Sequence, residues 1–480
     1  MPEVKKYHPN VGAPRTAPNE EPAEERAKDF RPVDNGFTKA QAVAEANRCL
    51  DCKKPMCMEG CPVGVHIPQF IEKIREEDWG GALETIKGDN LLPSVCGRVC
   101  PQENQCEGKC VLGRKGEPVA IGQLERMVGD MAPEVGVAPE CKPSNGKKVA
   151  IVGSGPSGIA CAGELAREGF EVTVFEAFFT GGGVLTYGIP EFRLPKDIVK
   201  REIDSLEQLG VNFEYNSVAG RLFNADDLFN DEGYDAMYLA VGAGLPRFLH
   251  VPGENLPGVY CANEFHTRTN LMHAYSFPEY DTPIHHGKNV VVFGGGNVAM
   301  DAARTALRLG AESVTLAYRR TENEMPARKA EVHHAKEEGV QIMELSNPVR
   351  FFAGPDGFVS AIQLQRMKLG DPDPSGRRRP IPVPDSEFVI PCDVAVTAIG
   401  TRANPFPELC ADVELNRWGY IETDDDGRTS DPRIWAGGDI VTGAATVILA
   451  MGAGKKAAAS MKKVLLEGDD APAAAEPAEA

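Results

Sequence analysis

The sequence predicts an α/β protein in which two Rossmann-like nucleotide-binding domains follow a helical domain rich in cysteine. Three observations support this prediction: eight cysteines fall between positions 49 and 110, a glycine-rich strand and helix pattern begins at position 147, and a second such pattern begins at position 288. A chain of 480 residues is long enough for about three domains of ~150 residues each.

Composition and charge narrow the possible partners. Hydrophobic residues make up 42% of the chain and charged residues 25%, as in ordinary globular proteins. The formal net charge is -19, which repels phosphate, so we expect no nucleic-acid partner and no anionic-membrane partner. No run approaches the ~18 consecutive apolar residues of a membrane helix, and the first residues lack the apolar segment of a secretion signal. We therefore expect a cytoplasmic protein.

The domain boundaries follow from changes in composition along the chain. Residues 1–30, with five prolines and many charges, are expected to be a solvated, mobile end. The segments CDVAVTAIG and RIWAGGDIVTG look like a return to the first nucleotide-binding domain, so the second would be inserted into it. The predicted parts are a helical domain over 1–145, a first nucleotide-binding domain over 146–282 and 391–465, a second over 283–390, and a disordered tail over 466–480.

The first glycine-rich pattern has the form that binds a dinucleotide. It follows the strand VAIV and opens a helix, so the helix N-terminus can donate N–H groups to a pyrophosphate. Glu176 ends the next strand, 23 residues after Gly153, where a carboxylate accepts hydrogen bonds from ribose hydroxyls. The candidate dinucleotide-binding residues here are Gly153, Ser154, Gly155, Pro156, Ser157, Gly158 and Glu176.

A second copy of the pattern differs where the ribose would bind. Its corresponding residues, in a GxGxxA form, are Gly294, Gly296, Asn297 and Ala299. The following strand ends in Arg319 and Arg320 instead of an acid, and two guanidinium groups could grip a 2′-phosphate. Such contacts contribute ~1.5–3 kcal/mol each, enough for a ~100-fold preference for NADP over NAD. We predict NADPH here and FAD at the first pattern, although a solvated strand end could also carry arginines.

A third stretch fits a flavin site. The sequence AGGD ends at Asp439, before a helix that starts near Thr446. In flavoproteins of this build such an aspartate contacts the ribityl chain or pyrophosphate, and the helix N-terminus faces the flavin ring. Gly438, Asp439, Thr446 and Val447 are therefore candidate FAD-binding residues. Hydride transfer to a flavin requires orientation rather than a catalytic side chain, so no catalytic residue is predicted.

The N-terminal cysteines form two runs with iron–sulfur spacing. The runs are Cys49-x2-Cys52-x4-Cys57-x3-Cys61 and Cys96-x3-Cys100-x5-Cys106-x3-Cys110. Ferredoxins with two 4Fe-4S clusters share this spacing, and there the fourth cysteine of a run binds the other cluster. On that pattern one cluster takes Cys49, Cys52, Cys57 and Cys110, and the other takes Cys61, Cys100, Cys106 and a fourth group. Cys96 is the obvious fourth group, unless it lies on the wrong side of its turn.

Other chemistries for these cysteines stay open. Structural zinc sites also use closely spaced cysteines, but a zinc ion would give a chain with FAD and NADPH no electron acceptor. A disulfide reductase needs a dithiol beside the flavin, and the segment AFFTGGGVLTYGIPEF after Glu176 contains no cysteine. The histidine pair His333 and His334 lacks the spacing of a metal site, and we expect the isolated cysteines to be inert.

Taken in order, these motifs resemble those of a known family. The cysteine-rich helical domain, GSGPSG, GGGNVAMDAART, AYRR, AGGD and ILAMGAGK resemble the small (β) subunits of bacterial NADPH-dependent glutamate synthases, over about residues 37–463. The resemblance includes YGIPEFRLPK and RRTENEMPA, which are more specific than a glycine pattern. The same module resembles the N-terminal half of dihydropyrimidine dehydrogenase and the large subunit of electron-bifurcating transhydrogenases.

The resemblance implies an electron-transfer subunit. Hydride from NADPH would reach FAD, and single electrons would pass through two 4Fe-4S clusters to the large (α) subunit of glutamate synthase, which makes L-glutamate from L-glutamine and 2-oxoglutarate in a higher hetero-oligomer. In relatives of this module one cluster has a Gln or Glu ligand; the corresponding position here is Glu125, which puts Cys96 in doubt. The alternatives are an NADPH:ferredoxin or bifurcating transhydrogenase-type oxidoreductase, and a zinc-stabilised nucleotide-binding scaffold.

Overall fold

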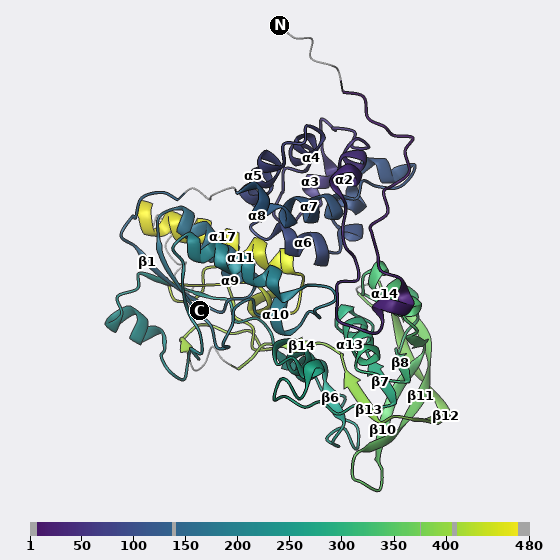
Figure 1. The fold of residues 1–480 in the computed structure, drawn as a ribbon. Helices are drawn as coiled ribbons and strands as arrows, with labels where there is room; N and C mark the ends of the chain where they lie inside the picture. Colours follow the sequence, from purple (N-terminus) through teal and green to yellow (C-terminus); the bar gives the residue numbers. More distant parts are fainter. Residues whose placement is uncertain (1–6, 137–140, 375, 406–409, 469–480) are drawn as a thin grey trace. The chain divides into compact units, whose positions relative to one another are not determined.

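The chain divides into two compact units. A computed structural model describes residues 7–136, 141–374, 376–405 and 410–468 (Figure 1). Unit 1 contains residues 1–137, 183–200 and 244–402, and unit 2 contains residues 138–182, 201–243 and 403–480. Each unit holds a parallel sheet of five strands, and the cysteine-rich helices belong to unit 1. The predicted fold class, two Rossmann-like domains preceded by a helical domain, is confirmed.

The cysteine-rich part of unit 1 consists of short helices around an apolar core. Thr38 starts one of them with a capping box, in which its hydroxyl accepts from the Gln41 N–H. Phe70, Leu124 and Cys106 lie buried in the shared core. The helices are α1 (Ala23–Arg26), α2 (Lys39–Ala46), α3 (Met56–Glu59), α4 (Ile67–Arg75), α5 (Trp79–Asp89), α6 (Pro93–Val99), α7 (Ile121–Asp130) and α8 (Ala132–Val135), with η1 (Gln102–Asn104), η2 (Glu107–Lys109) and η3 (Val111–Arg114).

Residues 7–34 form an arm that packs onto the rest of unit 1, whereas composition predicts a mobile end over 1–30. Arg26 is only 4% exposed, and its guanidinium lies 2.7 Å from Glu337 and 3.1 Å from Glu338. Arg15 pairs in the same way with Glu107 at 2.7 Å. Ion pairs that exist only in the folded chain therefore fix a segment whose composition alone indicates disorder. Residues 1–6 lie outside the described part.

The second nucleotide-binding domain is built on the parallel sheet of unit 1. Its strand order is β6-β13-β7-β8-β9, and aliphatic runs such as VVV in β7 are buried. Strands and helices alternate along the chain, as the sequence predicts. The elements are β6 (Val259–Cys261), α12 (Ala262–His266), η5 (Thr267–Leu271), η6 (Ala274–Ser276), β7 (Asn289–Phe293), α13 (Asn297–Arg308), β8 (Ser313–Ala317), η7 (Glu322–Glu324), α14 (Lys329–Glu337), β9 (Gln341–Met343) and β13 (Val394–Thr397).

This domain extends beyond the predicted range of 283–390. Strand β13 lies between β6 and β7, with Val394 opposite Val290 and Val396 opposite Tyr260. Both β6 and β13 were expected in the first nucleotide-binding domain, but they belong to unit 1. Pairing between segments far apart in the chain decides this boundary, and a short run such as VAVT does not show which sheet it joins.

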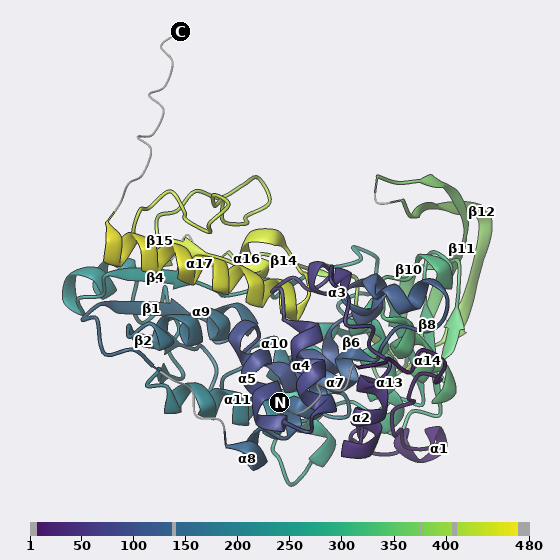
Figure 2. The ribbon, with the colours of Figure 1, turned by 90° about the horizontal axis from the view of Figure 1, so that it is seen from above.

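An antiparallel sheet is inserted between β9 and β13. Strands β11 and β12 form a long hairpin, which Figure 2 shows extending from the sheet. β12 is an edge strand, and prolines at positions 380, 382 and 384 limit further pairing along it. The strands are β10 (Ser346–Ala353), β11 (Val359–Pro372) and β12 (Arg378–Pro391), and a short ladder joins β5 (Leu245–Pro246) to β14 (Thr401–Arg402).

Unit 2 contains the first nucleotide-binding domain. Its strand order is β15-β4-β1-β2-β3, so the central strand β1 leads directly into the first glycine-rich loop. Strand β15 pairs with β4, and the C-terminal part of the chain thereby returns to this sheet. The elements are β1 (Lys148–Val152), α9 (Pro156–Arg167), β2 (Glu171–Phe175), β3 (Asn212–Glu214), η4 (Asp227–Asp231), β4 (Ala236–Leu239), β15 (Ile434–Ala436), α16 (Asp439–Thr442) and α17 (Val447–Glu467); α10 (Val184–Tyr187) and α11 (Lys196–Gln208) lie between β2 and β3 in the chain.

Helix α17 ends at Glu467, so the first two residues of the predicted tail are helical. Residues 469–480, the rest of that tail, lie outside the described part of the chain. None of the helices in the described residues combines the length and the apolar character of a membrane span.

Helices α17 and α9 lie side by side in unit 2, as Figure 2 shows. Their contact depends on Gly454, which is buried. A Cβ atom at this position would collide with the Ser157 carbonyl oxygen and lie 3.1 Å from the Cys161 backbone nitrogen. The backbones of the two helices are therefore so close that only glycine fits at this position.

We expect Gly454→Ala to destabilise the chain, although alanine favours a helix over glycine by ~1 kcal/mol. Overpacking of this kind costs ~1–3 kcal/mol, which should lower the melting temperature in a thermal unfolding experiment. Gly88→Ala in α5 is the matched control, because nothing lies within 4 Å of the added Cβ there. A Gly454→Ala chain that melts at or above the wild-type temperature would contradict the close packing.

Candidate functional site

The first glycine-rich loop joins β1 to α9. Gly153 has φ +103°, and a Cβ atom there would lie 2.6 Å from the Ala240 carbonyl oxygen, so a side chain does not fit. Gly158 packs directly against the Gly153 carbonyl oxygen. At Gly155, the N-cap of α9, nothing lies within 4 Å of a Cβ position, which leaves the helix N-terminus open to a ligand. The loop has the tight turn, the close packing and the open approach that pyrophosphate binding requires.

Glu176 follows β2 directly and is 5% exposed beside this loop. One carboxylate oxygen accepts hydrogen bonds from the Ser154 N–H, at 3.0 Å, and from the Ser154 hydroxyl. The other oxygen accepts from the Phe178 N–H at 2.9 Å. The carboxylate thus fixes the shape of the loop, and its contact with a ribose stays a prediction.

The candidate flavin residues near the C-terminus lie next to the first loop. Gly438 has φ +77°, and a Cβ atom there would lie 2.9 Å from the Ser157 Cβ. The Asp439 carboxylate accepts a backbone N–H at 3.2 Å, and burial raises its pKa. Thr446 caps α17, which begins at Val447 as predicted. The folding of unit 2 therefore brings Asp439 to the loop from nearly 300 residues away along the chain.

The second glycine-rich loop joins β7 to α13 in unit 1. Gly294 has φ +145° and packs against the Ala398 carbonyl oxygen, where a side chain would collide. Gly296, the N-cap of α13, has only Pro326 near its Cβ position, at 3.9 Å. Ala299 is fully buried, and its position in this loop corresponds to that of Gly158 in the first loop. This loop, too, offers an open helix N-terminus.

Arg319 and Arg320 follow β8 but lie in different surroundings. Arg320 is 7% exposed, and its guanidinium donates to the Arg378 carbonyl at 2.7 Å and to the Asp373 carboxylate at 3.1 Å. Arg319 is exposed and forms no hydrogen bond or ion pair with another described residue. Partial burial, and then the nearby positive charges of Arg320 and Arg377, lower the pKa of Arg319. Arg320 anchors the β11–β12 hairpin, whereas Arg319 is open to an anion.

The first predicted set of cluster ligands gathers in unit 1. A small cavity is lined by Cys49, Cys52, Cys57 and Cys110, together with apolar side chains such as Ile67 and Ile71. Burial raises the pKa of Cys49 and Cys52 and raises that of Cys57 to about 12. Metal binding displaces protons from such thiols, because only the thiolate is a ligand.

The second predicted set is Cys61, Cys96, Cys100, Cys106 and Glu125. Burial raises the pKa of Glu125 to about 7, and the Asn90 amide donates to its carboxylate at 2.6 Å. Cys96 contacts the same Asn90 side chain, its sulfur 3.7 Å from the amide oxygen. Burial, followed by nearby carboxylates that include Glu125, raises the pKa of Cys61 and Cys106. Glu125 and Cys96 both lie within this group.

Among the described residues, the sulfur atoms do not form the compact set of a closed zinc site. Four thiolates on one zinc ion, with zinc–sulfur bonds of ~2.3 Å, would lie about 3.8 Å apart. Among the residues that the structure describes, no three cysteine sulfurs lie within 4.8 Å of one another.

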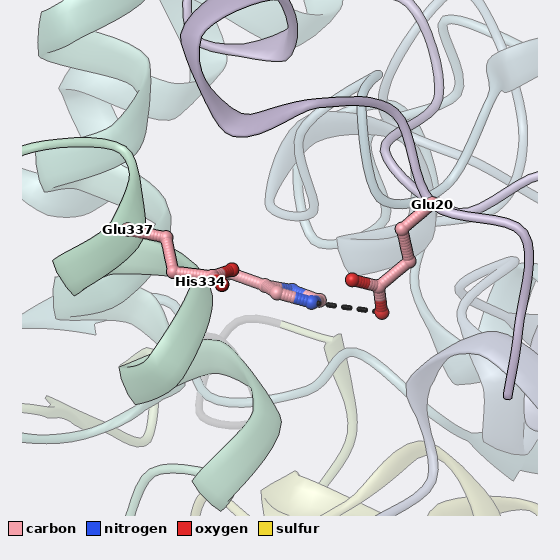
Figure 3. Close-up of side chains that lie close together, drawn as sticks. All are labelled: Glu20, His334 and Glu337. Carbon is pink, nitrogen blue, oxygen red and sulfur yellow. Dashed lines mark hydrogen bonds and ion pairs between the residues drawn. The ribbon is translucent and has the colours of Figure 1, made fainter.

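One set of side chains does lie close enough to share an ion. Glu20, His334 and Glu337 place their ligand atoms within 4.8 Å of one another (Figure 3). The His334 Nε2 atom lies 3.1 Å from the Glu20 carboxylate. Arg26 pairs with Glu20 at 3.5 Å and with Glu337 at 2.7 Å. Because the Arg26 guanidinium already pairs with both carboxylates, an ion-pair network accounts for this group without a metal.

Several residues that hold these sites together belong to none of the predicted sets. Asn90 contacts both Glu125 and Cys96. The backbone N–H of Arg328 donates to the Asn297 side chain at 2.9 Å, and the Arg328 side chain extends to the cysteine-rich part. The one sequence signal for Arg328 is its position directly after the segment RRTENEMPA.

Two family models match the chain. The model described as dihydropyrimidine dehydrogenase domain II, 4Fe-4S cluster, matches residues 26–137. The model described as pyridine nucleotide-disulphide oxidoreductase matches residues 147–454. The first match covers both cysteine groups, and the second covers both glycine-rich loops.

Individual proteins are similar to this chain over most of its length. The NADPH glutamate synthase small chain of Escherichia coli is 40% identical over 454 residues, which are 92% of this chain and 96% of that one. The NADP(+)-dependent formate dehydrogenase subunit beta of Moorella thermoacetica is also 40% identical, over 87% of this chain and 60% of its own. Mycobacterium tuberculosis FprA in complex with NADPH has a TM-score of 0.54 at 23% identity, over 69% of this chain and 88% of that chain, which shows a shared fold. The chain therefore belongs to the family of NADPH glutamate synthase small chains.

Proposed function

We propose that the chain is the NADPH-oxidising subunit of a glutamate synthase. It would pass electrons from NADPH through FAD and two 4Fe-4S clusters to a large (α) subunit that makes L-glutamate from L-glutamine and 2-oxoglutarate. The main support is the combination, in a member of this family, of two different nucleotide loops with two separate groups of buried and half-buried cysteines. We place the reaction in the cytoplasm, in a higher hetero-oligomer.

Unit 2 supplies the residues for FAD. FAD and the clusters, when bound, convert a hydride transfer into one-electron steps. Gly155 and the N-terminus of α9 would receive the pyrophosphate, while Glu176 still has free lone pairs for a ribose hydroxyl in addition to its three loop contacts. Asp439 would contact the ribityl chain or pyrophosphate. Thr446 and Val447 start the helix whose N-terminus would face the flavin ring.

Unit 1 supplies the residues for NADPH. The loop from Gly294 to Asn297 would hold the pyrophosphate at the N-terminus of α13. Arg319 would bind the 2′-phosphate directly. Arg320 would act through the β11–β12 hairpin, because its contacts with Asp373 and the Arg378 carbonyl hold the turn of that hairpin near Arg319.

The cluster ligands divide into two sets. One cluster would take the set that lines a shared cavity, Cys49, Cys52, Cys57 and Cys110. The other would take Cys61, Cys100 and Cys106 with Glu125 as the fourth ligand. Glu125 is favoured over Cys96 because the resemblance to this family implies a Gln or Glu ligand at this position, and both side chains lie beside Asn90.

A second candidate acceptor follows from the relatives. The Moorella formate dehydrogenase subunit beta is as similar to this chain as the Escherichia coli chain is, at 40% identity. The same electron-transfer module could therefore serve another NADP-linked oxidoreductase complex. In that case the partner would not be an amidotransferase.

Purification of the tagged full-length chain from native extract distinguishes these functions. We expect a yellow-brown preparation that contains flavin and iron, together with a much larger chain that releases ammonia from L-glutamine. Recovery of a formate-oxidising or other redox partner instead would favour the second acceptor. A preparation without flavin or without iron would contradict both.

We expect Arg319→Gln to lower the preference for NADPH over NADH by about tenfold or more, because one charge-assisted contact of ~1.5–3 kcal/mol is lost. The measurement is the ratio of kcat/KM values for the two nucleotides with an artificial electron acceptor. Lys288→Gln is the control, since Lys288 is an exposed cation of the same unit that pairs with Glu312 at 2.8 Å. An unchanged ratio in Arg319→Gln would show that Arg319 does not contact the 2′-phosphate.

Substitution of the fourth ligand should remove one cluster. Glu125→Ala should retain roughly half of the iron of the wild-type chain, because one of two four-iron clusters loses a ligand. Cys96→Ala should retain nearly all of it. Iron and acid-labile sulfide per chain, determined after anaerobic purification, provide the comparison. The reverse pattern, with iron lost only in Cys96→Ala, would assign Cys96 as the ligand.

A further inference from the structure

Arg328 connects two sites that lie in the same compact unit, the second glycine-rich loop and the second cysteine group. It is the N-cap residue of α14, and its side chain is 13% exposed. Its guanidinium lies between two loops of the chain rather than in solvent. Arg328 belongs to neither the nucleotide-binding motifs nor the cysteine motifs.

The guanidinium of Arg328 binds the end of α6, the helix that carries Cys96. Nη1 donates to the Arg98 carbonyl at 2.9 Å, and Nη2 donates to the side-chain oxygen of Gln102 at 2.7 Å. Carbonyl groups in the last turn of a helix have no partner within the helix, and the helix dipole makes a cation favourable there. Arg328 thus stabilises the backbone directly before Cys100.

Gln102 extends this contact to both helices of the second cysteine group. It is 4% exposed, and its amide nitrogen donates to the Cys96 carbonyl at 3.3 Å and to the Gly97 carbonyl at 3.0 Å. The same amide packs so closely against Gly122 of α7 that a Cβ atom there would collide with it. Helix α7 carries Glu125. The Arg328 guanidinium therefore holds a residue wedged between the two helices that carry candidate ligands.

The backbone around Arg328 is bonded to the second glycine-rich loop. The Arg328 N–H donates to the Asn297 side-chain oxygen at 2.9 Å, and the Ala327 N–H donates to the Gly295 carbonyl at 3.2 Å. On the other side, the Lys329 N–H donates to Glu103, next to Gln102, at 3.2 Å. A segment of three residues is thus hydrogen-bonded to the nucleotide loop and to the cysteine-bearing loop at once.

We infer that Arg328 is a positioning residue that couples occupancy of the NADPH site to the redox state of the second cluster. The inference rests on the proposed function. The Arg328 guanidinium also pairs with the Glu103 carboxylate at 3.5 Å, and a positive charge fixed beside the ligands favours the reduced cluster, which carries one more negative charge. A pyrophosphate bound at the N-terminus of α13 would act on the loop of Gly295 and Asn297, and the bonds to residues 327 and 328 would transmit any shift to the turn between Cys96 and Cys100. By linkage, reduction of the cluster must change nucleotide affinity by the same factor.

Redox titration of the full-length chain tests this coupling. Electron paramagnetic resonance follows each cluster, with and without NADP+. In Arg328→Gln, the ratio of reduced to oxidised second cluster at a fixed potential should fall by about tenfold, equivalent to ~59 mV for a one-electron couple, while the other cluster stays unchanged. Arg328→Lys keeps the positive charge but cannot donate to the Arg98 carbonyl and to Gln102 at the same time. In this variant the reduction potential of the second cluster should stay near that of the wild type. In both variants the response of this cluster to NADP+ should be weaker than in the wild type, because the side-chain contacts with Arg98 and Gln102 are lost while the backbone contacts remain.

Lys329→Gln is the matched control, because it removes an exposed positive charge one residue away while the backbone contact with Glu103 remains. It should behave as the wild type. If Arg328→Gln retains full iron content and shifts neither the potential nor the NADP+ response, or if the wild-type cluster does not respond to NADP+, the inference is wrong. If Arg328→Gln loses iron, the NADP+ response of the second cluster in Arg328→Lys decides the test. A wild-type chain without iron would instead overturn the proposed function.

Discussion

Two groups of buried and half-buried thiols organise the cysteine-rich part of unit 1. Its helices have between 4 and 11 residues, and isolated helices of such lengths are marginal in water. The cysteines stand at the ends and turns of these helices, and Cys106 is part of their apolar core. Burial raises the pKa of Cys49, Cys57 and Cys106, and ligation would replace the protons of such thiols with metal. The free energy of metal binding would then also be free energy of folding for this part of the chain.

Charged side chains, together with aromatic contacts such as Phe30 stacked on Tyr275, join the arm and the segment YGIPEFRLPK to the nucleotide-binding part of unit 1. Arg304 is fully buried and pairs with Glu331 at 2.5 Å and Glu338 at 2.8 Å. Arg193 of that segment pairs with Glu331 at 3.1 Å, and Arg26 of the arm pairs with Glu338. Burial alone would raise the pKa of both glutamates, but the arginines lower it to about 2. Loss of one partner from such a network costs ~3–5 kcal/mol, because a buried charge is left alone.

Local chemistry explains which features could be predicted from the sequence. The positive φ of Gly153, the helix start at Val447 and the gathering of Cys49, Cys52 and Cys57 depend on neighbours within a few residues, and the structure shows all of them. The alternation of short strands and helices likewise predicted both parallel sheets.

Features that depend on distant segments could not be predicted in this way. The sheet that β13 joins is decided by its pairing with β6 and β7, more than 100 residues earlier. Arg26 is held in place by glutamates more than 300 residues away along the chain. Arg320 forms an ion pair with Asp373 in the turn of the β11–β12 hairpin, and the sequence of this turn, DPDPSGRRRP, does not predict that contact. Arg328 is a further case, since its partners Arg98 and Gln102 lie in the cysteine-rich part.

In this proposal, electrons from NADPH reach iron held by these cysteines. The most direct measurement is anaerobic addition of NADPH to the full-length chain, purified with any partner it retains, followed by electron paramagnetic resonance and visible absorbance. We expect the flavin absorbance to fall and a signal from reduced iron–sulfur clusters to appear. Iron that never changes valence while the flavin is reduced, or a chain that contains no iron, would contradict it.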